Sequence, residues 1–475
     1  MGRHREAPRP VPTHTLPSGC FLQSRRIVFG RSPQDPYRWA SQDVVDPARS
    51  VPVVQDGPQM STGPNHRDDA RTDSLRATCH RTVQRAEQEL TALSRSIHAE
   101  PELAFAEHRS AAKIAELMRS HGFDLRLPVA GLDTAFVAEY GTGDLVVGVC
   151  AEYDALPEVG HACGHNIIAA AGAGAALALA AVADDLGITV RLIGTPAEET
   201  GGGKVLMLER GVFDDVALAM MVHPGPEEVC RPGSLAITDL EVRYSGRAAH
   251  AAAAPDLGVN AADAITVAQV AIGLLRQHLE PRQMVHGIVT AGGAAPNIVP
   301  AATAAVYNLR AAESHSLQRL ENRIRACFEA GATATGCTAE VVQVSPVYAE
   351  LDTDEWLSEA YRAAITELGR EPLDRSAERD RVIGSTDMGN VTRRLPAIHP
   401  MIAVDCGSAV NHQAEFAAAC ASPSADRAVV DAAVAMAWTA VAAATDPDQR
   451  VRLLAAVQGR PGASTEEFFA SGGVA

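Results

Sequence analysis

The stretch AEYDALPEVGHACGHN at residues 151–166 decides the predicted fold, together with TPAEETGGGK at 195–204 and MMVHP at 220–224. Each fragment follows a short apolar run rich in Val, Ile or Leu, which predicts a buried strand. Because ligands of open α/β sheets bind outside the carboxyl ends of the strands, the residues after these strands should meet at one edge. They combine imidazole, carboxylate and thiol groups, a donor set that divalent transition metals prefer. The residues are Asp154, Cys163, His165, Glu198, Glu199 and His223. The pattern predicts a metal site, and a hydrolytic one.

Taken singly, these motifs have ordinary explanations. A free cysteine is often simply buried, and a Glu-Glu pair usually lies on a solvated surface. Glu198 and Glu199, however, stand between an apolar run and three glycines at 201–203, where the backbone can turn tightly and approach a ligand closely. Functional residues concentrate in loops of this kind, so the combination favours a site.

Five fragments in this order resemble the amidohydrolase branch of the zinc aminoacylase and carboxypeptidase superfamily, metallopeptidase family twenty, subfamily D. They are AEYDALP, HACGHN, TPAEETGGGK, SGRAAHAA and the late NH-x-x-x-F, within about residues 70–450. Tyr153 and Asn166 bring the chain nearest to the p-aminobenzoyl-glutamate hydrolase subunits and dipeptidase-like members of that branch. The resemblance implies an α/β fold, in which a zinc-peptidase-like catalytic domain with a mostly parallel sheet carries an inserted ferredoxin-like α+β dimerisation domain.

The chain is long enough for two domains. The sequence pattern of residues 235–346 predicts the order strand, helix, strand, strand, helix, strand, which is the ferredoxin-like motif. Residues 1–59 hold nine prolines and eight arginines against five acids, so we interpret them as irregular and Met60 as the natural start. The expected segments are a disordered or mis-annotated extension at 1–69, a catalytic domain at 70–234 and 347–455, the inserted dimerisation and lid domain at 235–346, and a loose tail at 456–475.

Two helical patterns affect how the site is interpreted. Residues 74–121 have a helical period, within which Pro101 should begin a helix. The acids that follow, Glu102 and Glu107, are therefore interpreted as structural, because glutamate is favoured near helix amino termini. Residues 166–183 are almost uncharged, but they are mostly Ala and Gly, so we predict a helix packed closely on the sheet and not a membrane span.

The composition limits which kinds of partner and which cellular compartment fit the protein. The formal net charge of -17 argues against nucleic acid or an anionic membrane as a partner. Nine cysteines at irregular spacing fit a reducing compartment better than a disulfide framework, so we expect a cytoplasmic protein.

The resemblance implies a role for each site residue. Its metal ligands would be Cys163, His165, Glu199, His223 and His412. Five ligands suit two divalent ions, zinc or manganese, that share a bridge, for which the thiolate of Cys163 is suited. Glu198 would be the general base, and Asp154 would orient a ligand imidazole. His250 would contact substrate or the oxyanion across a homodimer formed through 235–346. The candidate substrate contacts are Asn297, Arg310 and Asp387.

These assignments predict a metal-dependent amidohydrolase that acts on an N-acyl amino acid, aminobenzoyl-glutamate or a dipeptide-like substrate. Two alternatives stay open. In the first, Cys163 is a nucleophile and His165 its base, although residues two apart on one loop seldom reach that geometry. In the second, the protein is a non-catalytic metal-binding or partner subunit of the same fold.

Overall fold

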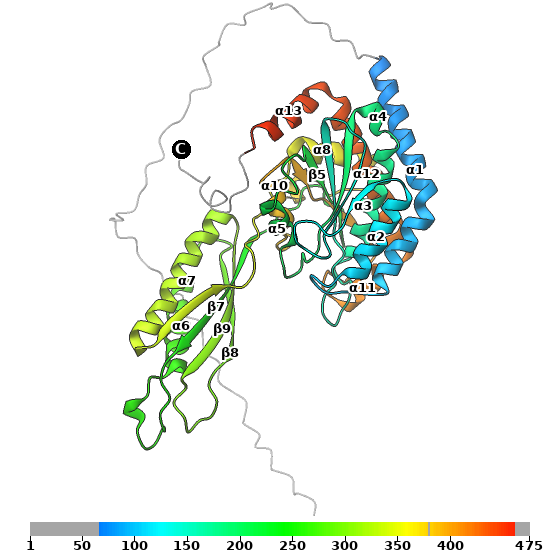
Figure 1. Ribbon diagram of the computed structural model, residues 1–475. Coiled ribbons are helices and arrows are strands. Elements are labelled where there is room, and N and C mark those ends of the chain that lie inside the picture. The colour runs from blue at the N-terminus through cyan, green and yellow to red at the C-terminus, as the bar shows by residue number, and fades with distance from the viewer. Residues whose placement is uncertain (1–65, 379–380, 461–475) are drawn as a thin grey trace, which may run out of the picture. The chain divides into compact units, whose positions relative to one another are not determined.

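The larger sheet brings the three predicted strands side by side. The computed structural model describes residues 66–378 and 381–460 (Figure 1). Its larger sheet has the strand order β1-β2-β4-β3-β5-β11. The strands are β1 Asp124–Arg126, β2 Phe136–Tyr140, β3 Leu145–Ala151, β4 Ile188–Gly194, β5 Leu218–Met220 and β11 Ala397–Ile398. β4, β3, β5 and β11 are parallel, whereas β1 and β2 are antiparallel to their neighbours. Every residue of β3, β4 and β5 is buried, which confirms the strand prediction.

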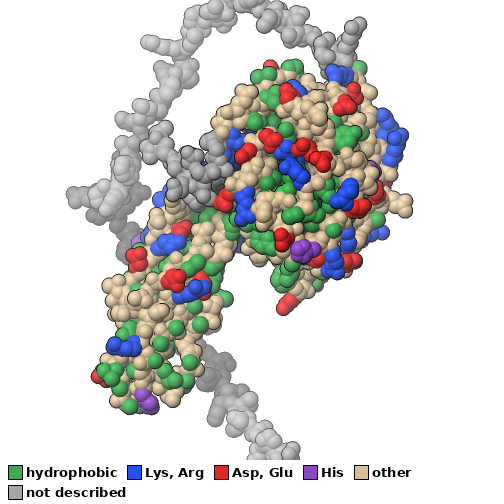
Figure 2. Space-filling model, in the orientation of Figure 1, with side chains coloured by type: hydrophobic (Ala, Val, Ile, Leu, Met, Phe, Trp, Pro, Cys, Tyr) green, Lys and Arg blue, Asp and Glu red, His purple; other side chains and the backbone are tan. Residues whose placement is uncertain are grey.

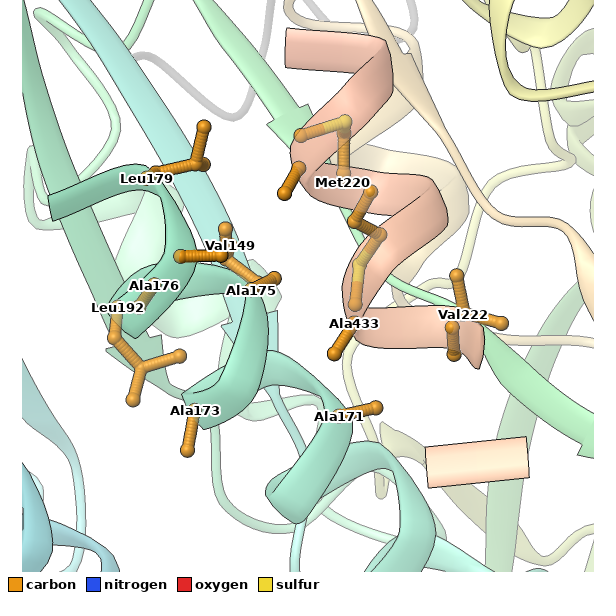
Figure 3. Close-up of a cluster of buried hydrophobic side chains, with 14 of the residues drawn as sticks. Val149, Ala171, Ala173, Ala175, Ala176, Leu179, Leu192, Met220, Val222 and Ala433 are labelled. Carbon is orange, nitrogen blue, oxygen red and sulfur yellow. The ribbon is translucent and has the colours of Figure 1, made fainter. Parts of the chain in front are cut away.

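The Ala- and Gly-rich run forms a helix in the core, as predicted. It is α3, His165–Ala180, which packs against α1, His66–His98, and α12, Pro423–Thr445. Figure 3 shows α3 and α12 side by side, with small side chains such as Ala171 and Ala433 between them. A Cβ at Gly174 of α3 would lie 2.9 Å from the Cβ of Ala433, so the helices approach closely only because this position has no side chain.

One described helix, α12, is long and apolar enough to cross a membrane by length and composition alone. Most of α12 is buried inside the protein, against α1, α3 and α8, Glu355–Glu367. We therefore assign α12 to the core.

Shorter elements complete the part of the chain around the larger sheet. A two-stranded parallel sheet pairs β6, His223–Gly225, with β12, Met401–Ala403. The remaining helices here are α2 His108–Ser120, α4 Ala183–Leu186, α5 Gly203–Glu209, α9 Arg375–Glu378, α10 Met388–Thr392, α11 Ala414–Ala419 and α13 Pro447–Gln458.

Three expectations differ from the structure. The predicted helix start at Pro101 is wrong, because α2 begins at His108 and the chain turns at Phe105, which has a positive φ of 60°. Helix α1 begins at His66, inside the segment expected as an extension, and α13 continues through Gln458, inside the expected tail. The Met60 start and the rest of both terminal segments lie outside the described residues.

A second sheet with its own core lies between β6 and α8 in the sequence. Its elements are β7 Ala236–Ser245, η1 Pro255–Leu257, α6 Ala261–Leu275, η2 Arg276–His278, β8 Met284–Ala291, β9 Ala302–Ala311, α7 Ser314–Thr335 and β10 Thr338–Gln343. The strands form an antiparallel sheet in the order β10-β7-β9-β8, and α6 and α7 pack on it (Figure 1). This arrangement, which we call the lobe, has the predicted ferredoxin-like topology. Its core includes Tyr244, Leu309 and Phe328.

Candidate metal centre

Strand ends and one helix start bring the predicted donors together. Cys163 lies in the loop after β3, and His165 is the first residue of α3. Glu199 follows β4, and His223 begins β6 shortly after β5. Gly164 has a φ of 80°, and a Cβ there would lie 2.4 Å from the proline that follows His223. Glycine at this position therefore allows Cys163 and His165 to approach the strand that carries His223.

The donors form two triads that share Cys163. One triad is Cys163, His165 and His223, and the other is Cys163, Glu199 and His412. Within each triad the donor atoms lie within 4.8 Å of one another. Cys163 Sγ is 3.4 Å from His223 Nε2, and His412 Nε2 is 3.6 Å from Glu199 Oε2. If two divalent cations were bound, each triad would hold one of them, and Cys163 would belong to both sets.

Hydrogen bonds leave the same ring nitrogen of two histidines facing the centre. His165 Nδ1 lies 3.0 Å from Asp154 Oδ1 and 2.9 Å from the Asp154 carbonyl oxygen. His223 Nδ1 lies 2.8 Å from the carbonyl oxygen of Pro224. When Nδ1–H donates in this way, Nε2 of each ring keeps its lone pair for a metal. Asp154 Oδ2 also accepts the backbone N–H of Glu199 at 3.0 Å, so this carboxylate supports both triads. Burial raises the pKa of Asp154, but the charge and hydrogen bond of His165 outweigh burial and hold it below its usual value.

Several buried polar atoms at the centre have no hydrogen-bond partner among the described residues. They are Glu152 Oε2, His165 Nε2 and Glu199 Oε1. A buried polar group without a partner costs about 1–3 kcal/mol, so a cluster of such atoms beside a thiol fits a bound cation. The mixture of sulfur, nitrogen and oxygen donors fits a divalent transition metal.

Glu198 belongs to neither of the triads that contain Cys163, although its carboxylate also lies within 4.8 Å of donor atoms of His165 and Glu199, and of Glu152 and Asp387. Its Oε2 is 4.0 Å from His165 Nε2, and its side chain lines a pocket next to the centre. Burial, followed by the charges of Glu152 and Glu199, raises the pKa of Glu198 well above its usual value. A carboxylate in this position can exchange a proton with a molecule bound at the centre.

The pocket has a volume of about 470 Å³ and includes a cationic side chain from the lobe. Arg310 of β9 is half-buried in the pocket wall. Its Nη1 donates to Ser385 Oγ at 3.1 Å, and its Nε donates to Asn308 Oδ1 at 3.1 Å. Both hydrogen-bond partners are neutral, and the charge of Asp239 acts on the guanidinium without forming a salt bridge with it, so Arg310 can still donate to a ligand in the pocket.

Of the four predicted substrate or oxyanion contacts, only Arg310 lines this pocket; His250, Asn297 and Asp387 do not. His250 and Asn297 are exposed and lie next to each other on two connections of the lobe, where the carbonyl of Asn297 accepts the N–H of Ala251. Asp387 is fully buried, and its Oδ1 lies 2.7 Å from Lys204 Nζ. In this structure the Asp387 carboxylate therefore binds a lysine of the protein and does not face the pocket.

Four buried residues around the centre are not among the predicted site residues. They are Glu152, Lys204, Tyr348 and His399. Glu152 Oε2 lies 3.4 Å from His165 Nε2, and Lys204 Nζ binds the other oxygen of Glu152. His399 lines the pocket and stacks on His223, with ring centroids 5.5 Å apart. Glu152 and Lys204 stand inside the quoted motifs, but no spacing in the sequence indicates that they meet.

Comparisons with known proteins find relatives that cover most of this chain. Residues 148–437 match the Peptidase family M20/M25/M40. The Xaa-Arg dipeptidase of Mus musculus is 37% identical over 391 residues, which cover 78% of this chain and 89% of that protein. One of the p-aminobenzoyl-glutamate hydrolase subunits of Escherichia coli (strain K12) is 35% identical over 274 residues, which cover 53% of this chain and 57% of that protein.

A solved structure shares the fold. It is a Bacillus subtilis protein described as a dinuclear metal binding peptidase from the M20 family. The TM-score is 0.57 at 22% sequence identity, and the superposition covers 76% of this chain and 98% of that chain.

Proposed function

Because the chain belongs to peptidase family M20/M25/M40, we propose that it is a metal-dependent amidohydrolase of small substrates that carry an amide beside a carboxylate. The substrate class is an N-acyl amino acid, an aminobenzoyl-glutamate or a dipeptide-like molecule. The family membership makes the protein a hydrolase that acts on C–N bonds. The observation that carries the proposal is the pair of donor triads that share Cys163 beside a pocket.

The five triad residues would hold two divalent ions, zinc or manganese. Cys163 would bridge the two ions, with His165 and His223 completing one set and Glu199 and His412 completing the other. Ions held there supply Lewis acidity, which polarises an amide carbonyl and lowers the pKa of water. The unpartnered Nε2 of His165 and Oε1 of Glu199 support this assignment.

Glu198 is the residue that we assign as the general base. A raised pKa increases the proton affinity of the Glu198 carboxylate, which suits a group that accepts a proton and later returns it. Glu198 takes a proton from the attacking water and delivers it to the departing amide nitrogen. Asp154 keeps the His165 ring in one orientation and one tautomer during these steps.

The position of Arg310 in the pocket wall supports the proposal that the substrate carries a carboxylate. A guanidinium matches the planar geometry of a carboxylate and can donate two hydrogen bonds to it. Arg381, which also lines the pocket, is already paired with Glu227 at 2.8 Å, whereas Arg310 donates to neutral side chains. The similarity to a dipeptidase over most of both chains supports dipeptides as the first substrates to try.

We also propose a homodimer through residues 235–346, in which His250 and Asn297 reach the site of the partner. Strand β8 is an edge strand of the lobe sheet, and most of its side chains are exposed. Figure 2 shows hydrophobic side chains at the surface of the lobe. The large exposed hydrophobic residues of α6 and β8 are Val270, Leu274, Ile288 and Val289. An edge strand beside apolar side chains offers a second copy both backbone hydrogen bonds and hydrophobic contact.

The proposed location is the cytoplasm. All eight cysteines among the described residues are free. Burial raises the pKa of the thiols of Cys79 and Cys150 to about 12, so these thiols remain protonated. Unpaired, unreactive thiols fit a reducing compartment.

The alternative of a cysteine nucleophile has less support. Burial and the charge of Glu199 raise the pKa of the Cys163 thiol well above its usual value, because they outweigh the charge and hydrogen bond of His165, which lower it. A nucleophilic cysteine instead needs a lowered pKa, provided by a neighbouring base or positive charge. The non-catalytic alternative remains as an outcome of the experiment below.

The test measures metal content and turnover on the same preparation. The panel contains N-acyl amino acids, aminobenzoyl-glutamate, β-alanyl dipeptides and dipeptides that end in arginine. We expect about two equivalents of metal per chain, and activity that a chelator removes and zinc or manganese restores. Magnesium is the control, because this hard cation prefers oxygen ligands and should not restore activity. Two equivalents of metal without turnover on any substrate would favour a binding or partner role.

A further inference from the structure

We propose that Tyr348 is a positioning residue for Glu198, an assignment that rests on the proposed role of Glu198 as the general base. Tyr348 lies in the segment that leads from β10 to α8. Its hydroxyl donates to the backbone carbonyl of Glu198 at 2.7 Å, and both residues are buried. Burial raises the pKa of Tyr348 far above its usual value, so the hydroxyl keeps its proton and remains a donor.

The loop that carries Glu198 needs support from outside itself. Ala197 has a φ of 59°, a left-handed conformation that costs a residue with a side chain about 1–3 kcal/mol. Such a conformation persists only where the surroundings hold it. The N–H of Ala197 donates to Glu107 Oε1 at 2.9 Å, and the carbonyl of Glu198 accepts from Tyr348. The general base therefore lies between two buried hydrogen bonds to distant parts of the chain.

The ring of Tyr348 also contacts the far end of this loop. Gly202 has a φ of 62°, and a Cβ there would lie 2.9 Å from Tyr348 Cε1. The ring thus packs directly against the glycine backbone, while the hydroxyl holds Glu198. One side chain fixes both ends of the segment from Glu198 to Gly202.

Tyr348 is itself held in place by strand β7 of the lobe. Its backbone exchanges two hydrogen bonds with Ile237, at 3.0 Å and 3.1 Å. These bonds fix the backbone of Tyr348. Its hydroxyl therefore holds the carbonyl of Glu198 in one position relative to β7.

The expected effect is confined to turnover. Without the hydroxyl, the carbonyl of Glu198 has lost its buried donor, and the loop can relax from the strained conformation at Ala197. Glu199 keeps a separate support, because its N–H donates to Asp154 Oδ2. Metal content should therefore persist while Glu198 moves away from the reacting atoms.

The experiment compares Tyr348→Phe with Tyr244→Phe in the full-length, metal-loaded protein. Tyr244 is the matched control, because its buried hydroxyl also donates to a backbone carbonyl, that of Phe328 in the lobe, at 2.9 Å. We expect kcat to fall by about ten- to hundredfold in Tyr348→Phe, with metal content unchanged. KM should also stay the same, because phenylalanine keeps the ring that lines the pocket. Tyr244→Phe should keep the kcat of the unmodified protein. Equal kcat values in all three proteins would overturn the proposal.

A second measurement does not depend on activity. Amide hydrogen exchange of peptides that cover residues 196–203 should be faster in Tyr348→Phe and unchanged in Tyr244→Phe. If the unmodified protein has no turnover on any substrate, the proposed function fails, and faster exchange would still support the tether. Unchanged exchange in Tyr348→Phe would overturn the tether, whatever the activity of the enzyme.

Discussion

Glu198 and Glu199 are neighbours in the sequence, but their surroundings give them separate roles. Glu199 belongs to the triad with Cys163 and His412, whereas Glu198 belongs to neither triad. We expect Glu198→Gln to keep the metal and to lower kcat by about 10²- to 10⁴-fold, the usual contribution of a general base. Glu199→Gln should lower metal content and turnover together. Metal analysis with steady-state kinetics on each variant checks this, and the assignment fails if both variants keep metal and activity.

We expect His161 to make the stability of the protein depend on pH. Its side chain is buried, and burial, followed by the charge of His165, lowers its pKa from 6.5 to about 3. Above pH 6.5 the ring is neutral in both the folded and the unfolded chain, so it adds no pH dependence. As pH falls from 6.5 toward 3, only the unfolded chain binds the proton, and the free energy of unfolding decreases by up to about 1.4 kcal/mol per pH unit.

The variant His161→Leu should remove this contribution. We measure the free energy of unfolding by urea denaturation between about pH 6.5 and 4.5. Its slope against pH should be smaller than in the unmodified protein by the amount that corresponds to about one proton taken up on unfolding. Identical slopes would show that His161 is not the group responsible.

At the scale of elements, the strands were predictable and the partners of the loops were not. β3, β4 and β5 are apolar runs that are buried throughout, so composition alone identifies them. The prediction of a helix start at Pro101 is wrong because Glu102 lies several residues before α2 and caps the amino terminus of that helix from a distance. Its carboxylate accepts the backbone N–H groups of Arg109 and Ser110 in the first turn of α2. Nothing local in the sequence distinguishes that arrangement from a helix that begins at the proline.

The close packing of α3 makes a prediction at the same scale. Gly174→Ala places a Cβ 2.8 Å from Leu90 Cδ1 and 2.9 Å from Ala433 Cβ, so α3 and α12 must move apart. We expect a net loss of about 1 kcal/mol of stability, because overpacking outweighs the gain in helix propensity. Gly273→Ala in α6 is the control, since nothing lies within 4 Å of its Cβ, and it should not destabilise. Thermal unfolding of both variants measures the difference, and equal shifts of the same sign would contradict it.

At the scale of the whole molecule, motif order predicted the family, the fold class and the five residues of the two triads. The family is confirmed by the match over residues 148–437 and by the dipeptidase relative. Lys204 and Tyr348 were missed because their partners, Asp387 and Glu198, lie about 150 residues or more away in the chain and meet them only in the fold. The proposed roles of the exposed His250 and Asn297 depend on a second copy of the chain, which no pattern within one chain specifies.

The proposed homodimer therefore gives the most demanding prediction. If His250 acts only in the partner's site, Glu198→Gln and His250→Ala each inactivate a homodimer for different reasons. A mixed dimer of the two variants contains one complete site, which combines Glu198 of one chain with the partner's His250. Unfolding and refolding an equal mixture should place about half of the chains in mixed dimers and restore about a quarter of the normal activity. Each variant refolded alone is the control. Recovery absent from the mixture, with mixed dimers detected by native mass spectrometry, would mean that His250 does not act across the dimer.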